Sequence, residues 1–527
     1  MSLAMDRKWG SWFRETARSG RGVWYSEGGK LIRMDYSDMY AGALALSEIL
    51  QEERDCSGTF LAVIWMEQSP GYLQALMAVL LAGGIAVPVH PRATKEEVRE
   101  LCRFLEAELA IVPGERISAF NRSDTLDGNV SYPAAVMDGE CGIVQRLHPN
   151  GLRSVHTRSY SPPPEASVIF MSSGSTGKPK GIMLSDCNML SNVRSIQDYI
   201  RLTADDRVLL TKSFGYSSTI TGEWLLALDR GADLFLFDGV LHPLELVRLV
   251  KAHGITFLCT VPSAVVPWMK SSLWKKEDLA TLERMIIVGG AVPPDTLLEL
   301  KQRIPWVDIM PSYGLTEASP RVSYLPAEEL WLRPGSAGIP VPGVEITVRR
   351  PDGGEADPEE QGEIFVSGPN VMLGYYNMPK RTRETLTPQG LRTRDLGCKD
   401  REGFLYVAGR GDTALNAGGH TVYPEQIEAV LATHPAVGSV GVTSYTAEEG
   451  ERLVAFIEQA GGSAVEAGEL CEELSAYVRS TMSPMYRPKE IRIVSGLPVT
   501  NSGKLDRAAL RIWAMECERI VSEGGIR

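Results

Sequence analysis

Hydrophobic and polar residues follow two distinct patterns along the first part of the chain. Residues 36–52 carry apolar side chains at helical spacing, beginning with Met39 and Ala43, whereas residues 59–65 form the continuous apolar run of a buried strand. The two patterns recur as helices at residues 72–80 and 95–106 and as strands at residues 85–89 and 109–113. Strands that alternate with helices predict parallel strands joined by helical crossovers.

The same alternation returns after residue 205. It predicts strands at residues 206–210, 232–237, 255–260 and 285–288 and helices at residues 223–229, 243–253 and 293–303. Between the two regions, residues 114–165 are rich in Pro, Gly, Ser and Asn and predict a long connection without regular structure.

From about residue 336 the pattern changes to short strands, expected at residues 345–348, 362–366 and 403–407. The first two flank a turn at residues 352–354 (Asp-Gly-Gly). A further unit begins near residue 410, with helices expected at residues 424–433, 468–482 and 510–521 and strands at residues 437–443, 452–459 and 491–494. We therefore predict an α/β protein with two domains. Residues 1–409 form a large domain of strand–helix subdomains with a small β-barrel-like layer, and residues 410–527 form a small α+β domain.

Composition narrows the possible classes of protein. A chain of 527 residues is too long for one core, and 44% hydrophobic with 23% charged residues is typical of a globular protein. The net charge of −12 argues against a nucleic-acid binder. The eight cysteines form no Cys-x-x-Cys pair and no cluster with histidine, which disfavours a zinc site or a disulfide framework. No secretory or membrane-spanning segment stands out, so we expect a cytoplasmic protein.

Residues 171–181 (Met-Ser-Ser-Gly-Ser-Thr-Gly-Lys-Pro-Lys-Gly) carry the most distinctive chemistry. Glycines let backbone amides converge on an anion, while the hydroxyl groups donate hydrogen bonds and the lysines add positive charge. A polyphosphate is therefore the expected ligand. Pro179 excludes the common nucleotide P-loop, because it offers no hydroxyl for a metal and disfavours a helix at Lys178. The apolar runs at 166–170 and 182–184 instead predict a strand, a loop and a second strand.

Three further motifs have chemistry that suits a nucleotide. Residues 313–317 (Tyr-Gly-Leu-Thr-Glu) combine a flat ring for a purine, a hydroxyl for a phosphate and a carboxylate for Mg2+. Asp395 can accept hydrogen bonds from both ribose hydroxyls, and Arg410 can bind ribose or phosphate. A turn at residues 498–503 would present Lys504 on an exposed loop. Each motif alone could equally be an ordinary turn, a cap or a surface lysine.

In this order, the motifs resemble those of the adenylate-forming superfamily, which includes acyl-CoA synthetases, amino-acid-activating domains of peptide synthetases and luciferases. Further matches at residues 81–84, 335–340, 374–376, 418–419 and 423–428 extend the resemblance from about residue 40 to residue 510. The resemblance implies an ATP site formed by Ser172, Ser173, Gly174, Ser175, Thr176, Gly177, Lys180, Gly289, Gly290, Ala291, Tyr313, Gly314, Asp395 and Arg410.

The resemblance also implies the remaining roles. Glu317 holds Mg2+, and Thr316, Glu317 and Lys504 act in catalysis, with Lys504 bridging the attacking carboxylate and the α-phosphate. Asp412 is the hinge about which a mobile C-terminal domain swings. Gly418 and Gly419 then border a tunnel for a pantetheine thiol.

The implied activity is that of an AMP-forming acid–thiol ligase, which converts a carboxylic acid and ATP into an acyl-adenylate and pyrophosphate. Coenzyme A, or the phosphopantetheine arm of a carrier protein, then accepts the acyl group as a thioester. No carrier domain is expected after residue 510, so a carrier would be a separate chain. Thr413 and Asn416 depart from the family pattern, which leaves the details of the thioester-forming conformation open.

The acid is less well defined. Its pocket is expected to involve Phe214, Gly215, Tyr216, Val261 and Val288, with Gly289 and Gly290 also at its border. Amino-acid-activating relatives carry an aspartate where this chain has Gly215, which disfavours a standard α-amino acid. Glu223 could bind a cationic group of the substrate or pair with a basic neighbour. Two alternatives stay open: a stand-alone enzyme that activates a β-amino or other non-α-amino acid, and a family member without catalytic activity.

Overall fold

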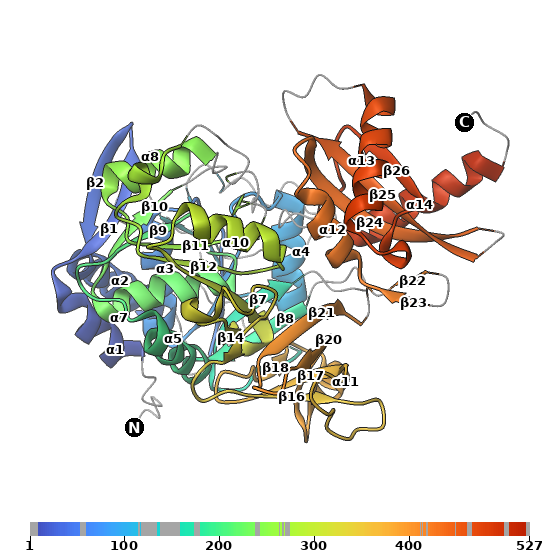
Figure 1. Ribbon diagram of the computed structural model, residues 1–527. Coiled ribbons are helices and arrows are strands. Elements are labelled where there is room, and N and C mark those ends of the chain that lie inside the picture. The colour runs from blue at the N-terminus through green and yellow to red at the C-terminus, as the bar shows by residue number, and fades with distance from the viewer. Residues whose placement is uncertain are drawn as a thin grey trace.

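The computed structural model of the protein describes residues 9–52, 59–113, 116, 134–137, 159–172, 180–237, 243–262, 264–265, 268, 274–411, 413, 415–417, 420–447, 450–460, 466–499 and 505–522. It confirms the predicted α/β class, with a large N-terminal part and a smaller C-terminal part (Figure 1). Across these residues, no helix is long and apolar enough to cross a membrane.

The larger of the two main sheets contains nine strands in the order β15-β14-β13-β12-β11-β9-β10-β1-β2. Their bounds are β1 Gly22–Glu27, β2 Lys30–Asp35, β9 Arg207–Leu210, β10 Asp233–Leu236, β11 Phe257–Thr260, β12 Arg284–Ile287, β13 Asp308–Gly314, β14 Arg321–Tyr324 and β15 Ile339–Pro340. The strands from β13 to β1 run parallel, as the strand–helix alternation predicts. Parallel strands place their carboxyl ends at one edge, where ligands bind in open α/β sheets.

The second main sheet contains seven strands in the order β18-β8-β7-β4-β3-β5-β6. Their bounds are β3 Leu61–Ile64, β4 Ile85–Pro88, β5 Leu109–Pro113, β6 Ala134–Met137, β7 Ala166–Ser172, β8 Lys180–Ser185 and β18 Gly374–Tyr375. β7 and β8 pair antiparallel, so the predicted arrangement of strand, loop and strand is confirmed. β6 corrects the expectation for residues 114–165, because it adds a parallel strand to the sheet beside β5.

Helices cover both sheets and pack with them in three apolar clusters. Their bounds are α1 Trp9–Thr16, α2 Tyr36–Glu52, α3 Pro70–Leu81, α4 Lys95–Leu105, α5 Asp186–Ile200, α8 Pro243–His253 and α10 Pro294–Arg303. α3 is apolar on nearly all sides and is buried along almost its whole length, as expected of a helix enclosed by other elements. The hydroxyl of Tyr72 on α3 donates to the carbonyls of Ile64 (3.3 Å) and Val89 (3.2 Å), which ties the helix to the ends of β3 and β4.

One predicted helix has a different form in the structure. The helix expected at residues 223–229 is divided into α6 (Ser217–Thr219), a π-helical turn η4 (Ile220–Leu225) and α7 (Leu226–Arg230). All six residues of the π-helical turn are buried, including Glu223. A helical spacing pattern does not distinguish an α-helix from a single wider turn, and such turns are frequent at functional sites.

The predicted all-β layer is confirmed as a five-stranded sheet in the order β16-β17-β20-β19, with β21 paired to β20. The bounds are β16 Glu345–Arg349, β17 Gly362–Ser367, β19 Leu386–Thr387, β20 Gly390–Lys399 and β21 Leu405–Arg410, with helix α11 (Pro379–Thr385) beside them. The turn at residues 352–354 lies between β16 and β17, as expected. There the amide of Gly354 donates to Asp352 Oδ1 at 2.8 Å.

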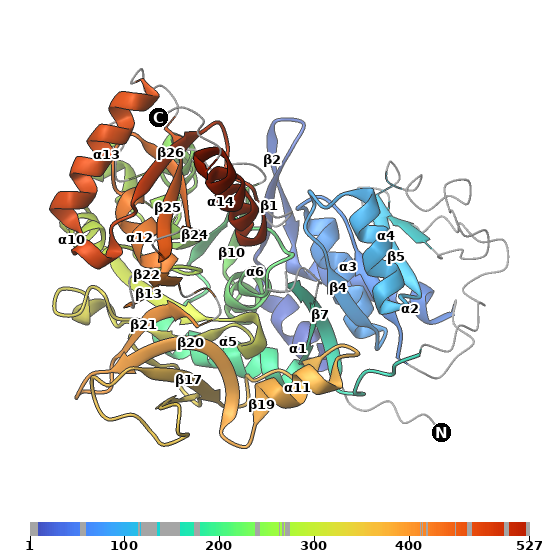
Figure 2. The same ribbon diagram turned by 90° about the vertical axis from the view of Figure 1, so that its right-hand side faces the viewer.

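The C-terminal part is built on the sheet β24-β25-β26 and joins the rest of the molecule after β21 (Figure 1). Its bounds are β22 Leu415–Ala417, β23 His420–Val422, α12 Pro424–Ala432, β24 Val437–Ala447, β25 Gly450–Gln459, α13 Ala467–Thr481, β26 Glu490–Val494 and α14 Arg507–Ser522. Helices α13 and α14 flank the sheet on opposite sides (Figure 2). Along β25, Leu453, Ala455 and Ile457 pack on one face, while Val454 and Phe456 pack on the other.

Candidate active site

The carboxyl ends of β9, β11, β12 and β13 bring several predicted site residues to one edge of the larger sheet. Val261 follows β11 and Val288 follows β12, while Tyr313 lies within the last residues of β13. Gly289 adopts a φ of +84°, and a Cβ placed there would lie 3.8 Å from Val261. The segments that follow β11 and β12 therefore lie against each other at the edge where ligands bind in open α/β sheets.

Tyr313 connects this edge to the β-layer. Its hydroxyl donates to Asp395 Oδ2 at 2.5 Å, and Asp395 is the strand partner of Arg410 between β20 and β21. Burial and the neighbouring Asp395 carboxylate raise the pKa of Tyr313 well above its ordinary value. The structure thus brings together the residues expected to meet the adenine, the ribose and a phosphate, although Asp395 and Arg410 follow Tyr313 by about eighty to a hundred residues in sequence.

The segment that follows Tyr313 requires glycine at one position. A Cβ at Gly314 would lie 2.1 Å from the carbonyl oxygen of Pro320, because β13 and β14 pair closely there. Beyond it, Thr316 Oγ1 accepts a hydrogen bond from Ser217 Oγ at 3.2 Å, and Glu317 Oε1 accepts one from the Tyr375 hydroxyl at 2.9 Å. Thr316 therefore faces α6, and Glu317 is oriented by β18.

Ser172 and Lys180 are strand partners at the two ends of the predicted phosphate loop. Lys180 is 7% exposed, and its ammonium group lies 5.4 Å from the centre of the Tyr375 ring. Burial lowers the pKa of Lys180; Glu317 opposes this effect, while Arg381, Arg410 and Arg394 reinforce it. A group of cations thus surrounds Lys180 and Glu317, which is the charge distribution that a polyphosphate with Mg2+ would neutralise.

Other predicted site residues lie outside the described residues: Ser173, Gly174, Ser175, Thr176, Gly177, Asp412, Gly418, Gly419 and Lys504. Their roles stay predictions. Ala291 lies within the described residues. It is exposed and comes two residues after Gly289, which lies against Val261.

The predicted acid-pocket residues lie along the start of α6 and the neighbouring strand ends. The ring of Phe214 is buried against Tyr72, with centres 5.1 Å apart. A Cβ at Gly215 would lie 3.0 Å from the backbone nitrogen of His90. The half-buried ring of Tyr216 meets His90 edge-on at 6.0 Å. His90, which follows β4, was not expected beside Gly215 and Tyr216, because no motif in the sequence marks it.

Beneath this region lies a buried group of ionisable side chains. Glu223 is fully buried in the π-helical turn, and its carboxylate forms an ion pair of 2.8 Å with Lys212. The pairing with a basic neighbour is thus the arrangement that the structure shows for Glu223. Lys212 also donates to Cys259 Sγ at 2.9 Å, and Arg321 Nη2 donates to the same sulfur at 3.3 Å. Burial raises the pKa of Glu223, and Lys212 opposes that effect.

A magnesium ion at the described residues would take part of its ligands from the nucleotide phosphates. No three His, Cys, Asp or Glu side chains within the described ranges come close enough together to hold a metal. Glu317 offers a carboxylate near Lys180, one of the cations expected to meet phosphate. Mg2+ commonly binds through one or two carboxylates plus substrate phosphates, so this donor set suits it.

Two family profiles match the chain. Residues 14–376 match the profile of the AMP-binding enzyme family, and residues 426–504 match that of the AMP-binding enzyme C-terminal domain. The chain is similar to a long-chain-fatty-acid–CoA ligase of Bacillus subtilis (strain 168), with 27% identity over 521 residues, which cover 91% of this chain and 90% of the relative. A 2-succinylbenzoate–CoA ligase of Bacillus cereus is 32% identical over 364 residues, covering 66% of this chain and 70% of the relative.

The fold is also similar to a crystal structure, that of ATP-bound MatB from Rhodopseudomonas palustris. The TM-score is 0.79 at 22% sequence identity, and the match covers 96% of this chain and 99% of the other. Both the N-terminal sheets and the C-terminal part therefore have counterparts among solved structures.

Proposed function

The chain belongs to the AMP-binding enzyme family, and on this basis we propose that it is an AMP-forming acid–thiol ligase. One observation carries the proposal. The Tyr313–Asp395 hydrogen bond and the Tyr375–Glu317 hydrogen bond join three sheets around Lys180, so groups suited to adenine, ribose, Mg2+ and phosphate meet at one place. The CoA ligases among the relatives support this choice of reaction.

In the proposed first step, a carboxylate oxygen of the acid attacks the α-phosphorus of ATP in line. The bond between that phosphorus and the oxygen bridging to the β-phosphorus breaks, and its electron pair leaves with pyrophosphate. Mg2+ at Glu317 would supply charge neutralisation for the phosphates. Lys504 stabilises the charge that develops on the α-phosphate, and the predicted loop at residues 173–179 holds the β- and γ-phosphates.

In the second step, a thiolate attacks the acyl carbon and releases AMP. We propose coenzyme A as the thiol, with the arm of a separate carrier protein as the alternative. The C-terminal domain would turn about Asp412 between the two steps, moving Lys504 away and bringing Gly418 and Gly419 to the thiol tunnel. The position of Arg410 at the end of β21, where the C-terminal part begins, supports a hinge at this point.

The residues around Phe214 support an apolar or aromatic acid. Phe214 and Tyr72 form a buried aromatic pair, and Val261 and Val288 contribute apolar side chains at the strand ends. Glu223 already has Lys212 as its partner, which weakens the alternative of a substrate with an amino group. The aryl and fatty acids in the names of several relatives agree with this proposal.

Product analysis tests the proposal. The protein is incubated with ATP, Mg2+ and one acid from a panel of fatty, aryl, β-amino and α-amino acids, with either CoA or a phosphopantetheinylated carrier protein. We expect AMP, pyrophosphate and an acyl-CoA thioester with an aryl or fatty acid. Formation of ADP and phosphate would contradict the proposed reaction. Acylation of the carrier protein but not of CoA would support the alternative acceptor.

A further inference from the structure

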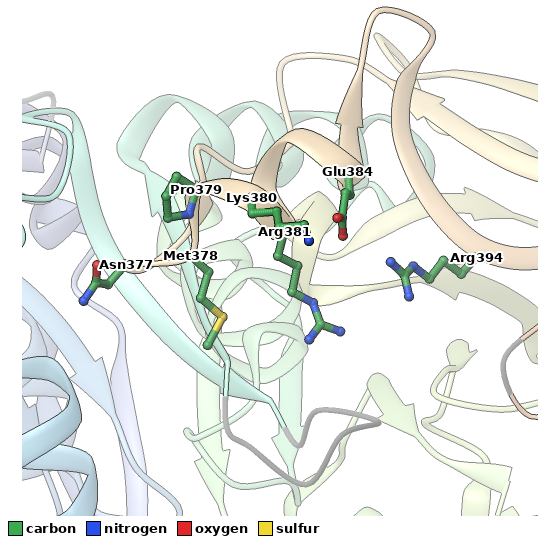
Figure 3. A pocket seen from close by; sticks show the side chains of 7 residues that line it. All are labelled: Asn377, Met378, Pro379, Lys380, Arg381, Glu384 and Arg394. Carbon is green, nitrogen blue, oxygen red and sulfur yellow. The ribbon is translucent and has the colours of Figure 1, made fainter.

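A pocket of about 570 Å³ opens beside the predicted nucleotide site. It is lined by residues 377–381 and Glu384 from around α11, and by Arg394 from β20 (Figure 3). The side chains of Arg381 and Arg394 extend toward each other into this space from the two elements (Figure 3). None of these residues belongs to the predicted ATP site.

The charges in the pocket are unbalanced. Lys380, Arg381 and Arg394 are cationic, and Glu384 is the one carboxylate among the lining residues. Among the described residues, neither guanidinium group forms an ion pair or a side-chain hydrogen bond, and Arg381 lies over the Tyr375 ring. Like charges repel, so two guanidinium groups that line one pocket favour the binding of an anion there.

The pocket is continuous with the groups that surround Lys180. Arg381 lies over the Tyr375 ring, 5.6 Å from its centre, and Lys180 lies 5.4 Å from the centre of the same ring. The hydroxyl of that tyrosine holds Glu317, the predicted Mg2+ ligand. Arg394 directly precedes Asp395, the predicted ribose ligand, and the carbonyl of Arg394 accepts a hydrogen bond from the amide of Gly411 at 2.8 Å. Arg381 therefore shares a ring contact with Lys180 near the predicted metal ligand, and Arg394 adjoins the predicted ribose ligand.

The backbone at Arg394 adds a separate observation. Its φ is +66°, in the left-handed region, which is strained for a residue with a side chain and natural for glycine. A guanidinium group is held in the pocket despite this strain. Such strain persists where the surrounding structure enforces it, and it concentrates at ligand-binding sites.

We propose that Arg381 and Arg394 form a clamp for the diphosphate group of the substrate nucleotide. This proposal rests on the proposed function. It adds Arg381 and Arg394 as two positioning residues for that reaction. Guanidinium groups bind phosphate oxygens in pairs and stay charged at all physiological pH values. The pair holds the β- and γ-phosphates of ATP, and it retains the pyrophosphate once the bond to the α-phosphorus has broken. Coenzyme A also carries a diphosphate, so the test includes it.

The test measures the dissociation constants of pyrophosphate, ATP, AMP and CoA for the full-length protein with Mg2+. The variants are Arg381→Ala and Arg394→Gly, and the matched control is Arg383→Ala, an exposed arginine of α11 that does not line the pocket. We expect each clamp variant to weaken pyrophosphate and ATP binding by about tenfold or more, because a charge-assisted hydrogen bond is lost. The dissociation constant of AMP for each clamp variant should stay within about twofold of wild type. All four dissociation constants of the Arg383→Ala protein should do the same.

Three outcomes would overturn the clamp. Unchanged pyrophosphate affinity in both clamp variants would show that these arginines do not bind the diphosphate. Loss of CoA affinity alone would assign the pocket to the thiol substrate. An equal loss of AMP affinity would indicate a general disturbance around Asp395.

Arg394→Gly relieves the positive φ at this position. A melting temperature at or above that of wild type would therefore show that the affinity loss of this variant is not a folding defect. A wild-type protein that binds neither ATP nor pyrophosphate would instead refute the proposed function.

Discussion

Replacing Lys504 by alanine is expected to slow acyl-adenylate formation by about 100- to 1,000-fold, the loss typical of removing one group that stabilises transition-state charge. The thioester-forming step should be spared, because Lys504 is proposed to act only while the α-phosphate is under attack. The two steps can be separated by trapping the acyl-adenylate with hydroxylamine in the absence of CoA, and by supplying preformed acyl-adenylate together with CoA.

Lys489→Ala is the matched control for this experiment. Lys489 is an exposed lysine just before β26 of the same C-terminal part, and its side chain has no proposed role. We expect the control to keep both rates. Equal losses in both steps for Lys504→Ala would contradict the role assigned to Lys504 and would indicate damage to the C-terminal domain as a whole.

The second large effect concerns stability. Glu223→Gln is expected to lower the free energy of unfolding of the N-terminal part by about 3 kcal/mol, because it leaves Lys212 charged and buried without its partner. Trp224, the next residue in the π-helical turn, is fully buried and contributes to the change in fluorescence during denaturant unfolding.

A matched control exists on α8. Glu245 forms an exposed ion pair with Arg248 at 3.6 Å, so Glu245→Gln should change the unfolding free energy by less than about 0.5 kcal/mol. The double variant Glu223→Gln/Lys212→Met should recover part of the loss, because the buried charge of Lys212 is removed while that of Arg321 stays. A Glu223→Gln protein as stable as wild type would show that the ion pair does not stabilise the fold.

The fold was predictable from the sequence where local pattern and local structure coincide. The apolar runs on both sides of residues 173–179 predict β7 and β8, and Pro179 correctly favours a strand over a helix after the loop. β6 was missed because four residues inside a Pro- and Gly-rich stretch carry too little periodicity, and only its pairing with β5 reveals it. The π-helical turn was missed because its apolar spacing resembles that of an α-helix.

Candidate site residues could be named from the sequence where one motif contains the chemistry. Tyr313, Glu317 and Asp395 were singled out because their flanking residues form recognisable motifs, and the structure adds a hydrogen bond between Tyr313 and Asp395. The partners that come from separate elements could not be found in this way. Lys212 and Glu223 are paired through the fold and not through a local motif, and Arg394 has no sequence signal of its left-handed backbone.

The proposed function requires that this site cleaves ATP between the α- and β-phosphates to activate a carboxylate. The most direct test is the exchange of labelled pyrophosphate into ATP, measured with Mg2+ and without CoA across a panel of fatty, aryl and amino acids. We expect exchange that depends on the acid, is strongest for an aryl or fatty acid, and is lost in Lys504→Ala. An absence of acid-dependent exchange, in a protein shown to bind ATP, would contradict the proposed function.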